Sequence, residues 1–120
     1  MIFDLHCDTI WKIQNTKDES LKKGSSLQID EEKLRAGKYL AQCFAMYVPA
    51  DTPQPTVVLE GLIARYYAEI AQCEHIRPAL CPDDFVRNQA AGKVSAVLSL
   101  EDACSLGGDL ENLEKVYRSG

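Results

Sequence analysis

The first residues of the chain alternate polar and apolar side chains. Residues 2–9 read I-F-D-L-H-C-D-T, so Asp4, His6 and Asp8 are spaced two residues apart. Because successive side chains of a β-strand point to opposite faces, a strand over residues 2–8 would place two carboxylates and an imidazole on one face. These groups are ligands for divalent metal ions. The same alternation is typical of an edge strand with one solvated face, so the pattern alone leaves both interpretations open.

Two later segments also predict strands. Residues 39–48 are almost continuously apolar, with Gln42 as the strongly polar exception, which is typical of a strand buried on both faces. Residues 94–100 form a short apolar run interrupted by alternating serines. By the same period-two rule, Glu101 lies at the carboxyl end of this run and on the face of the serines.

Helices are predicted between these strands. Four segments have helical spacing or helix caps: residues 31–36, residues 56–74, a helix opened by Pro82 and stopped by Gly92, and a helix capped by Asp109. The second carries an apolar stripe that favours packing against a sheet. For the last, we expect Leu110, Leu113 and Val116 or Tyr117 to form a buried face.

Two connections are predicted from their composition. Residues 15–26 are polar and charged and close at Gly24, which is typical of a surface loop. Residues 77–80 form a possible further extended piece, and His75 lies in the connection before it. A histidine at a helix end is ordinarily a surface residue, so we assign no chemistry to His75.

The alternation of strands and helices predicts parallel pairing through right-handed crossovers. In such folds, ligands bind beyond the carboxyl ends of the strands. Asp8 and Glu101 would lie at that end of two different strands, with His6 two residues further in. The first and third predicted strands would be separated by the second, so we expect a metal pair to bridge them more readily than a single ion.

Composition excludes several classes of partner. The net charge is −5 and no basic run is present, which argues against nucleic acid and anionic membrane surfaces. No apolar run approaches the roughly 18 residues of a membrane span, and no leader pattern precedes the first strand, so we expect a cytoplasmic protein. The 5 cysteines include no C-x-x-C pair, which favours neither disulfides nor a thiolate zinc site.

Three motifs together resemble one known family. They are D-L-H-C-D-T at residues 4–9, the segment Q-I-D-E-E-K-L-R-A-G-K-Y-L-A-Q-C-F-A-M-Y-V-P at residues 28–49, and G-K-V-S-A-V-L-S-L-E-D-A at residues 92–103. Their order and spacing resemble the amino-terminal part of the membrane dipeptidase (renal dipeptidase) family of zinc peptidases. The resemblance implies a (β/α)8 barrel that carries two zinc ions and hydrolyses dipeptides with a metal-bound hydroxide.

The resemblance also implies roles for individual residues. His6 and Asp8 match the family's H-x-D pair and would bind one zinc, and Glu101 matches the glutamate that would bridge both. The family commonly has glycines after that glutamate, whereas Asp102 and Ala103 stand here, which puts the shape of this loop in doubt. The remaining ligands and the acid/base residue belong to later strands, so no catalytic or other cofactor-binding residue is assigned within residues 1–120.

Length determines how much of such a fold this chain can form. A (β/α)8 barrel takes about 250 residues, so 120 residues can supply fewer than half of one. We therefore expect an α/β fold: a partial (β/α)8 barrel of the first three strands with their helices, forming one fragment of a single hydrolase domain.

Two functional hypotheses follow. The chain is the amino-terminal part of a zinc-dependent dipeptidase, active as the complete enzyme and inactive alone. The alternative is a non-catalytic module or subunit that needs another chain to complete the metal site. Open strand edges invite pairing with further chains, so a homo-oligomer is possible under either hypothesis.

Overall fold

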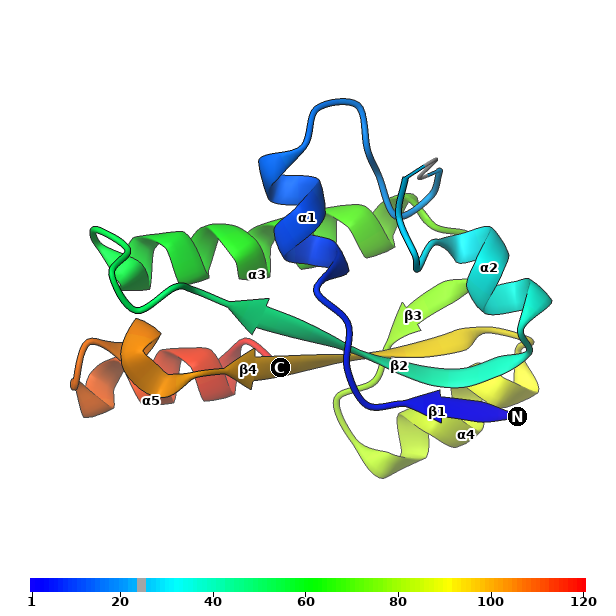
Figure 1. Ribbon diagram of the computed structural model, residues 1–120. Helices are drawn as coiled ribbons and strands as arrows, with labels where there is room; N and C mark the ends of the chain where they lie inside the picture. Colours follow the sequence, from blue (N-terminus) through cyan, green and yellow to red (C-terminus); the bar gives the residue numbers. More distant parts are fainter. Residues whose placement is uncertain (24–25) are drawn as a thin grey trace.

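A parallel four-stranded sheet organises the chain, as the computed structural model shows for residues 1–23 and 26–120 (Figure 1). Its strands are β1 (Ile2–Asp4), β2 (Tyr39–Tyr47), β3 (Ile76–Pro78) and β4 (Val94–Glu101), in the spatial order β1-β2-β4-β3. All three neighbouring pairs are parallel, which confirms the predicted pairing. The possible extended piece near Arg77 is a true strand, so the sheet has one strand more than the three predicted.

The predicted first strand is wrong in its second half. β1 ends at Asp4, and Asp8 is already the N-cap of helix α1 (Thr9–Asn15). The turn begins where the backbone N–H of His6 donates to the Asp4 side chain at 3.1 Å. One backbone hydrogen bond, from Ala45 N–H to the Cys7 carbonyl at 3.0 Å, still ties this segment to β2. His6 and Asp8 therefore lie on a connection rather than on a strand face.

The side of the sheet that each helix covers follows from the strand order. Helices α1, α2 (Glu31–Ala36) and α3 (Pro55–Gln72) lie on one side, and α4 (Pro82–Ala90) lies on the other (Figure 1). The chain moves in one direction across the sheet from β1 through β2 to β3, and then steps back from β3 to β4. Because crossovers between parallel strands are right-handed, the reversed step places its helix on the opposite face.

Helix α4 covers only the part of that face where the strands begin. Its Asn88 side chain donates to Ser95 Oγ at 3.1 Å, and its Phe85 ring lies 5.7 Å from the ring of Phe3. Ser95 is the second residue of β4, whereas Glu101 is its last. The carboxyl ends of the strands are consequently left uncovered by α4.

The hydrophobic core fills the space between the sheet and helices α1 and α3. Phe44 and Tyr66 are fully buried there, with ring centroids 5.8 Å apart. Further core residues on β2, α1 and α3 are Met46, Ile10, Ile13, Leu59, Leu62 and Ile70. Even-numbered residues of β2 face this core, in agreement with the period of a strand.

The segment predicted as a surface loop is anchored to the core. Leu21 is fully buried, its N–H donates to the buried Glu69 carboxylate at 2.7 Å, and its carbonyl accepts from Glu31 N–H at 2.8 Å. A single leucine among charged residues is a weak sequence signal, so this anchor was not predicted. Gly24, at which the loop was expected to close, lies outside the described residues.

The last helix departs from its predicted packing. Helix α5 (Leu110–Arg118) follows the short 3-10 helix η1 (Ala103–Leu106), and none of its residues is buried. Leu110 is 79% exposed and Tyr117 82%, so the predicted buried face is wrong within the residues that the structure describes. Val116 is partly buried, and Tyr67 donates to the Ser119 carbonyl to hold the helix end. We call Leu110, Leu113 and Tyr117 the α5 stripe.

The start of helix α4 predicts an acid-sensitive element. Asp84 accepts hydrogen bonds from Leu80 N–H at 2.8 Å and Cys81 N–H at 3.0 Å, and it pairs with Arg87. The Leu80 N–H above all, and then Arg87, lower the pKa of Asp84 from 3.8 to about 2. A carboxyl group whose pKa is lower in the folded chain stabilises the fold fully above its unfolded value and loses that effect as pH falls through its folded value.

We therefore expect α4 to keep its stability down to about pH 4 and to lose this contribution between about pH 4 and pH 2. Amide hydrogen exchange of α4 measured across this range tests it. In the Asp84→Asn variant, the protection factors of the α4 amides should be lower at neutral pH and should fall little further between pH 4 and pH 2. An unchanged acid transition in that variant would contradict the assignment.

Candidate metal centre

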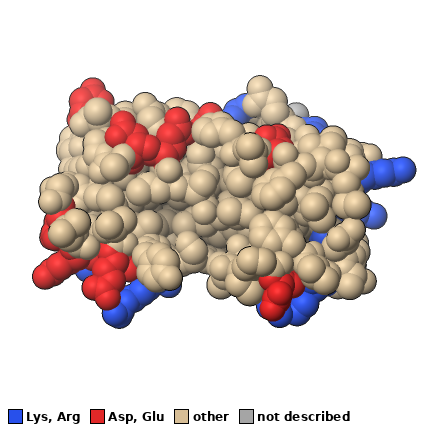
Figure 2. Space-filling view, turned by 90° about the horizontal axis from the view of Figure 1, so that it is seen from below, with Lys and Arg blue, Asp and Glu red and all other residues tan. Residues whose placement is uncertain are grey.

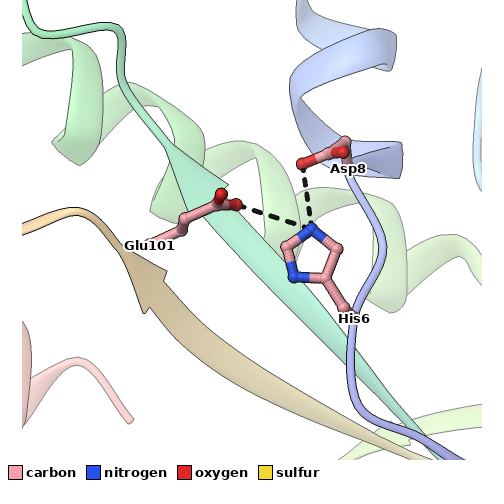
Figure 3. A group of neighbouring side chains, drawn as sticks. All are labelled: His6, Asp8 and Glu101. Atoms are coloured by element: carbon pink, nitrogen blue, oxygen red, sulfur yellow. Dashed lines mark ion pairs between the residues drawn. The ribbon is translucent and has the colours of Figure 1, made fainter.

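Three side chains meet beyond the carboxyl ends of the strands (Figure 3). His6 and Asp8 come from the connection between β1 and α1, and Glu101 is the last residue of β4. His6 Nε2 lies 3.4 Å from Asp8 Oδ1 and 3.5 Å from Glu101 Oε2. One ligand atom from each residue lies within 4.8 Å of the others. The structure thus brings the three residues named from the sequence into one cluster, which we call the rim cluster.

The spacing of the rim cluster suits a metal ion. A tetrahedral zinc ion with ligand distances of about 2.1 Å separates its ligand atoms by about 3.4 Å. The two His6 distances are close to that value. An imidazole nitrogen and two carboxylate oxygens are ligands that zinc accepts in catalytic sites. The residues therefore fit zinc by both geometry and donor chemistry.

The cluster is tighter than the strand spacing predicts. Since β2 lies between β1 and β4, residues on the outer two strands should be about two strand spacings apart. His6 and Asp8 avoid this separation because β1 ends early, and the His6 side chain then points past β2 toward Glu101 (Figure 3). The expected separation of two strand spacings is therefore wrong, and the three ligand atoms, all within 4.8 Å of one another, are also close enough for a single ion.

The Asp8 carboxylate is available as a metal ligand although Asp8 is the N-cap of a helix. An aspartate at an N-cap normally accepts a hydrogen bond from the first turn of its helix. Asp8 is the N-cap of α1, yet its side chain makes no such bond. Its carboxylate is instead turned toward His6. Asp4, the third polar residue of the alternation, is outside the cluster and accepts the His6 N–H.

Glu101 carries the clearest sign of a missing partner. Among the described residues its buried Oε2 atom makes no hydrogen bond, and it lies 3.5 Å from His6 Nε2. A buried carboxylate oxygen without a partner is costly, because it has lost its water and gained nothing in return. A cation within the rim cluster would satisfy it.

The first residue after Glu101 has a backbone conformation that is typical of glycine. Asp102 has φ 65°, in the left-handed region that L-residues rarely occupy. Its side chain accepts the Cys104 N–H at 3.0 Å and so secures the turn. Asp102 therefore takes, directly after Glu101, a backbone conformation that glycine adopts at lower cost.

Open space surrounds the rim cluster. A cavity of about 230 Å³ is lined by Asp8, Trp11, Tyr47 and Glu101, and a larger one of about 710 Å³ borders His6 and Asp8 on the side of α1. Trp11 and Tyr47 were not recognised from the sequence as neighbours of the site. Tyr47 pairs in register with Glu101 at the end of β2, and this end position was the available signal.

The cysteines and His75 are outside the cluster. Burial raises the pKa of the Cys7 thiol to about 11 and that of Cys73 to about 12, which keeps both protonated. His75 lies in the connection after α3, with Nε2 3.9 Å from Glu74. Within residues 1–23 and 26–120, no second group of three or more such ligand atoms converges as the rim cluster does.

Comparisons with known proteins show the family and the fold of the chain. The sequence model of the membrane dipeptidase family (peptidase family M19) matches residues 1–120. The crystal structure of dipeptidase AC, a metallopeptidase of family M19, superposes with a TM-score of 0.87 at 20% sequence identity. The match covers 99% of this chain and 40% of that one, so the chain spans less than half the length of that structure. A search of curated protein sequences finds no significant match.

No helix within residues 1–23 and 26–120 combines the length and the apolar character needed to cross a bilayer.

Proposed function

The chain belongs to the membrane dipeptidase family, peptidase family M19, and on that premise we propose that it is the amino-terminal part of a zinc-dependent dipeptidase. The observation that carries the proposal is the convergence of His6, Asp8 and Glu101 at the spacing of zinc ligands. The buried Glu101 oxygen that accepts no hydrogen bond among the described residues also supports it. The substrate class is a dipeptide, whose amide bond is hydrolysed.

The proposed roles follow from the positions of the donor atoms. His6 and Asp8 would hold one zinc ion, and Glu101, whose Oε2 lies 3.5 Å from His6 Nε2, would be the carboxylate shared with a second ion. Bound zinc supplies Lewis-acid polarisation of the scissile carbonyl and acidifies water. Trp11 and Tyr47 line the cavity beside Asp8 and Glu101 and offer an aromatic surface to a substrate side chain.

The complete enzyme needs more than these 120 residues. We propose that the sheet is part of a (β/α)8 barrel, in which further strands supply the remaining zinc ligands. The uncovered carboxyl end of the sheet and the 40% coverage of dipeptidase AC support this arrangement. The chain alone then holds three ligands, binds zinc weakly and is inactive.

A zinc titration followed by NMR tests the proposal. The chain has two histidines, one in the rim cluster and one outside it, so His75 is an internal control for His6. We expect zinc to shift or broaden the imidazole resonances of His6 and to leave those of His75 unchanged. Magnesium, which prefers oxygen ligands, should leave both unchanged. Equal responses of the two histidines to zinc would overturn the proposed site.

One observation favours the alternative of a module that needs another chain. At the free edge of β1, Ile2 is 43%, Phe3 48% and Leu5 72% exposed, and the α5 stripe is exposed as well. Exposed apolar edges favour association. Repeating the titration at tenfold higher protein concentration separates the two hypotheses, because the apparent zinc affinity rises with protein concentration only if a second chain contributes ligands.

A further inference from the structure

A second cavity lies at the other end of the sheet, where the strands begin. Its volume is about 280 Å³, and its walls come from the turn between α2 and β2 and from the turn between α4 and β4. Three of its lining residues are the cations Arg35, Lys38 and Lys93, and none is acidic. This basic cavity is separate from the rim cluster, which shares no residue with it.

Within residues 1–23 and 26–120, the cations of the basic cavity form no ion pair with a carboxylate. Among the described residues, the ion pairs of lysine and arginine involve Lys33, Arg65, Arg87 and Arg118. Arg35 and Lys38 take part in none of them. Lys93 donates one proton to the Glu74 carbonyl at 2.7 Å, and its other two remain available.

This concentration of positive charge is unusual for the chain as a whole. The net charge is −5, yet Lys and Arg side chains project from the right-hand end of the molecule in Figure 2, the end at which the strands begin in Figure 1. Three like charges around one cavity repel each other, and a bound anion removes that repulsion. The cavity is therefore electrostatically suited to a multivalent anion.

The backbone conformation of Lys38 is unusual for a lysine. Lys38 has φ 54°, a conformation that glycine adopts at lower cost, and Gly92 on the opposite wall has φ 68°. The lysine supplies the cavity with an ammonium group that a glycine could not. Arg35 adds a guanidinium, whose planar fork matches the oxygens of a phosphate.

We propose that the basic cavity binds a phosphate group. Arg35, Lys38 and Lys93 contact the phosphate oxygens, and the remaining volume accepts a small organic group against the Tyr39 ring. The ligand class is inorganic phosphate or a small phosphate monoester. The site is independent of the metal centre and of the proposed peptidase activity.

Amide chemical-shift titrations of the metal-free chain test this proposal. Inorganic phosphate is added at constant ionic strength, with sodium chloride as the matched salt, and glycerol phosphate in a parallel series. We expect saturable shifts at Lys38, Gly92 and Lys93 in the millimolar range of phosphate. Tighter binding of glycerol phosphate would identify a monoester as the ligand, and equal or weaker binding would identify phosphate itself.

The Lys38→Gly variant separates binding from folding. Glycine is favoured at this φ, so the fold should be kept or slightly stabilised while phosphate binding falls about tenfold or more. Lys17→Gly removes an exposed lysine just after the end of α1, outside the basic cavity, and is the control that should bind as the native chain does. Shifts that sodium chloride reproduces, or equal binding by the two variants, would overturn the proposal.

Discussion

Replacing Glu101 by glutamine is expected to lower the zinc affinity of the rim cluster by about 100-fold or more and to abolish dipeptide hydrolysis by the complete enzyme. Loss of a group that only orients a metal ligand costs about 10–100-fold, and Glu101 is proposed to be a ligand itself. Glutamine keeps the shape of the side chain but removes its charge. The NMR titration of His6 measures the affinity, and release of amino acids from a dipeptide measures the activity.

The fold should survive the Glu101→Gln substitution. The side chain is 43% exposed, and its buried oxygen makes no hydrogen bond that could be lost. We expect the free energy of unfolding to change by less than about 1 kcal/mol. Glu74→Gln is the matched control, because Glu74 is the partner of the other histidine and should affect neither zinc binding nor hydrolysis. Zinc-dependent activity that persisted in Glu101→Gln would refute the bridging role.

The residues of this site were predictable, although part of the reasoning was wrong. The period-two rule placed Glu101 correctly, because β4 is regular up to its last residue. His6 and Asp8 were assigned from strand alternation, yet β1 ends at Asp4. The rim cluster forms because the chain leaves the strand there, and local patterns do not encode the direction of such a turn. Trp11 was missed because nothing in its own segment indicates the site, and Tyr47 because its place at the end of β2 was not used.

The fold shows the same limit of sequence reasoning. Helix α2 has the predicted bounds, since Asp30 caps it by accepting the Lys33 N–H at 2.8 Å and Gly37 follows its last residue. The place of β3 outside β4 depends on a pairing between three-residue segments, which composition does not specify. That pairing alone puts α4 on the opposite face. The α5 stripe has the spacing of a buried face, but spacing does not show whether a partner is present.

The largest effect on stability is expected from Phe44→Ala. The Phe44 side chain is fully buried between β2 and α3 and packs edge-on against the Tyr66 ring. Truncating a buried phenylalanine costs about 3–5 kcal/mol, because the cavity collapses only in part. Domains of this size have a total stability of about 5–15 kcal/mol, so the variant loses a large part of its stability. Urea unfolding followed by the fluorescence of Trp11, the single tryptophan of the chain, measures the change in the free energy of unfolding.

Tyr117→Ala is the control, because it also removes an aromatic ring but from the exposed α5 stripe. With 82% of Tyr117 exposed, the cost should be below about 0.5 kcal/mol. A loss of less than about 1 kcal/mol in Phe44→Ala would place the core elsewhere. A loss in Tyr117→Ala close to that in Phe44→Ala would instead show that the stripe is covered in solution. The cost would then increase with protein concentration, because burial between chains follows mass action and burial within one chain does not.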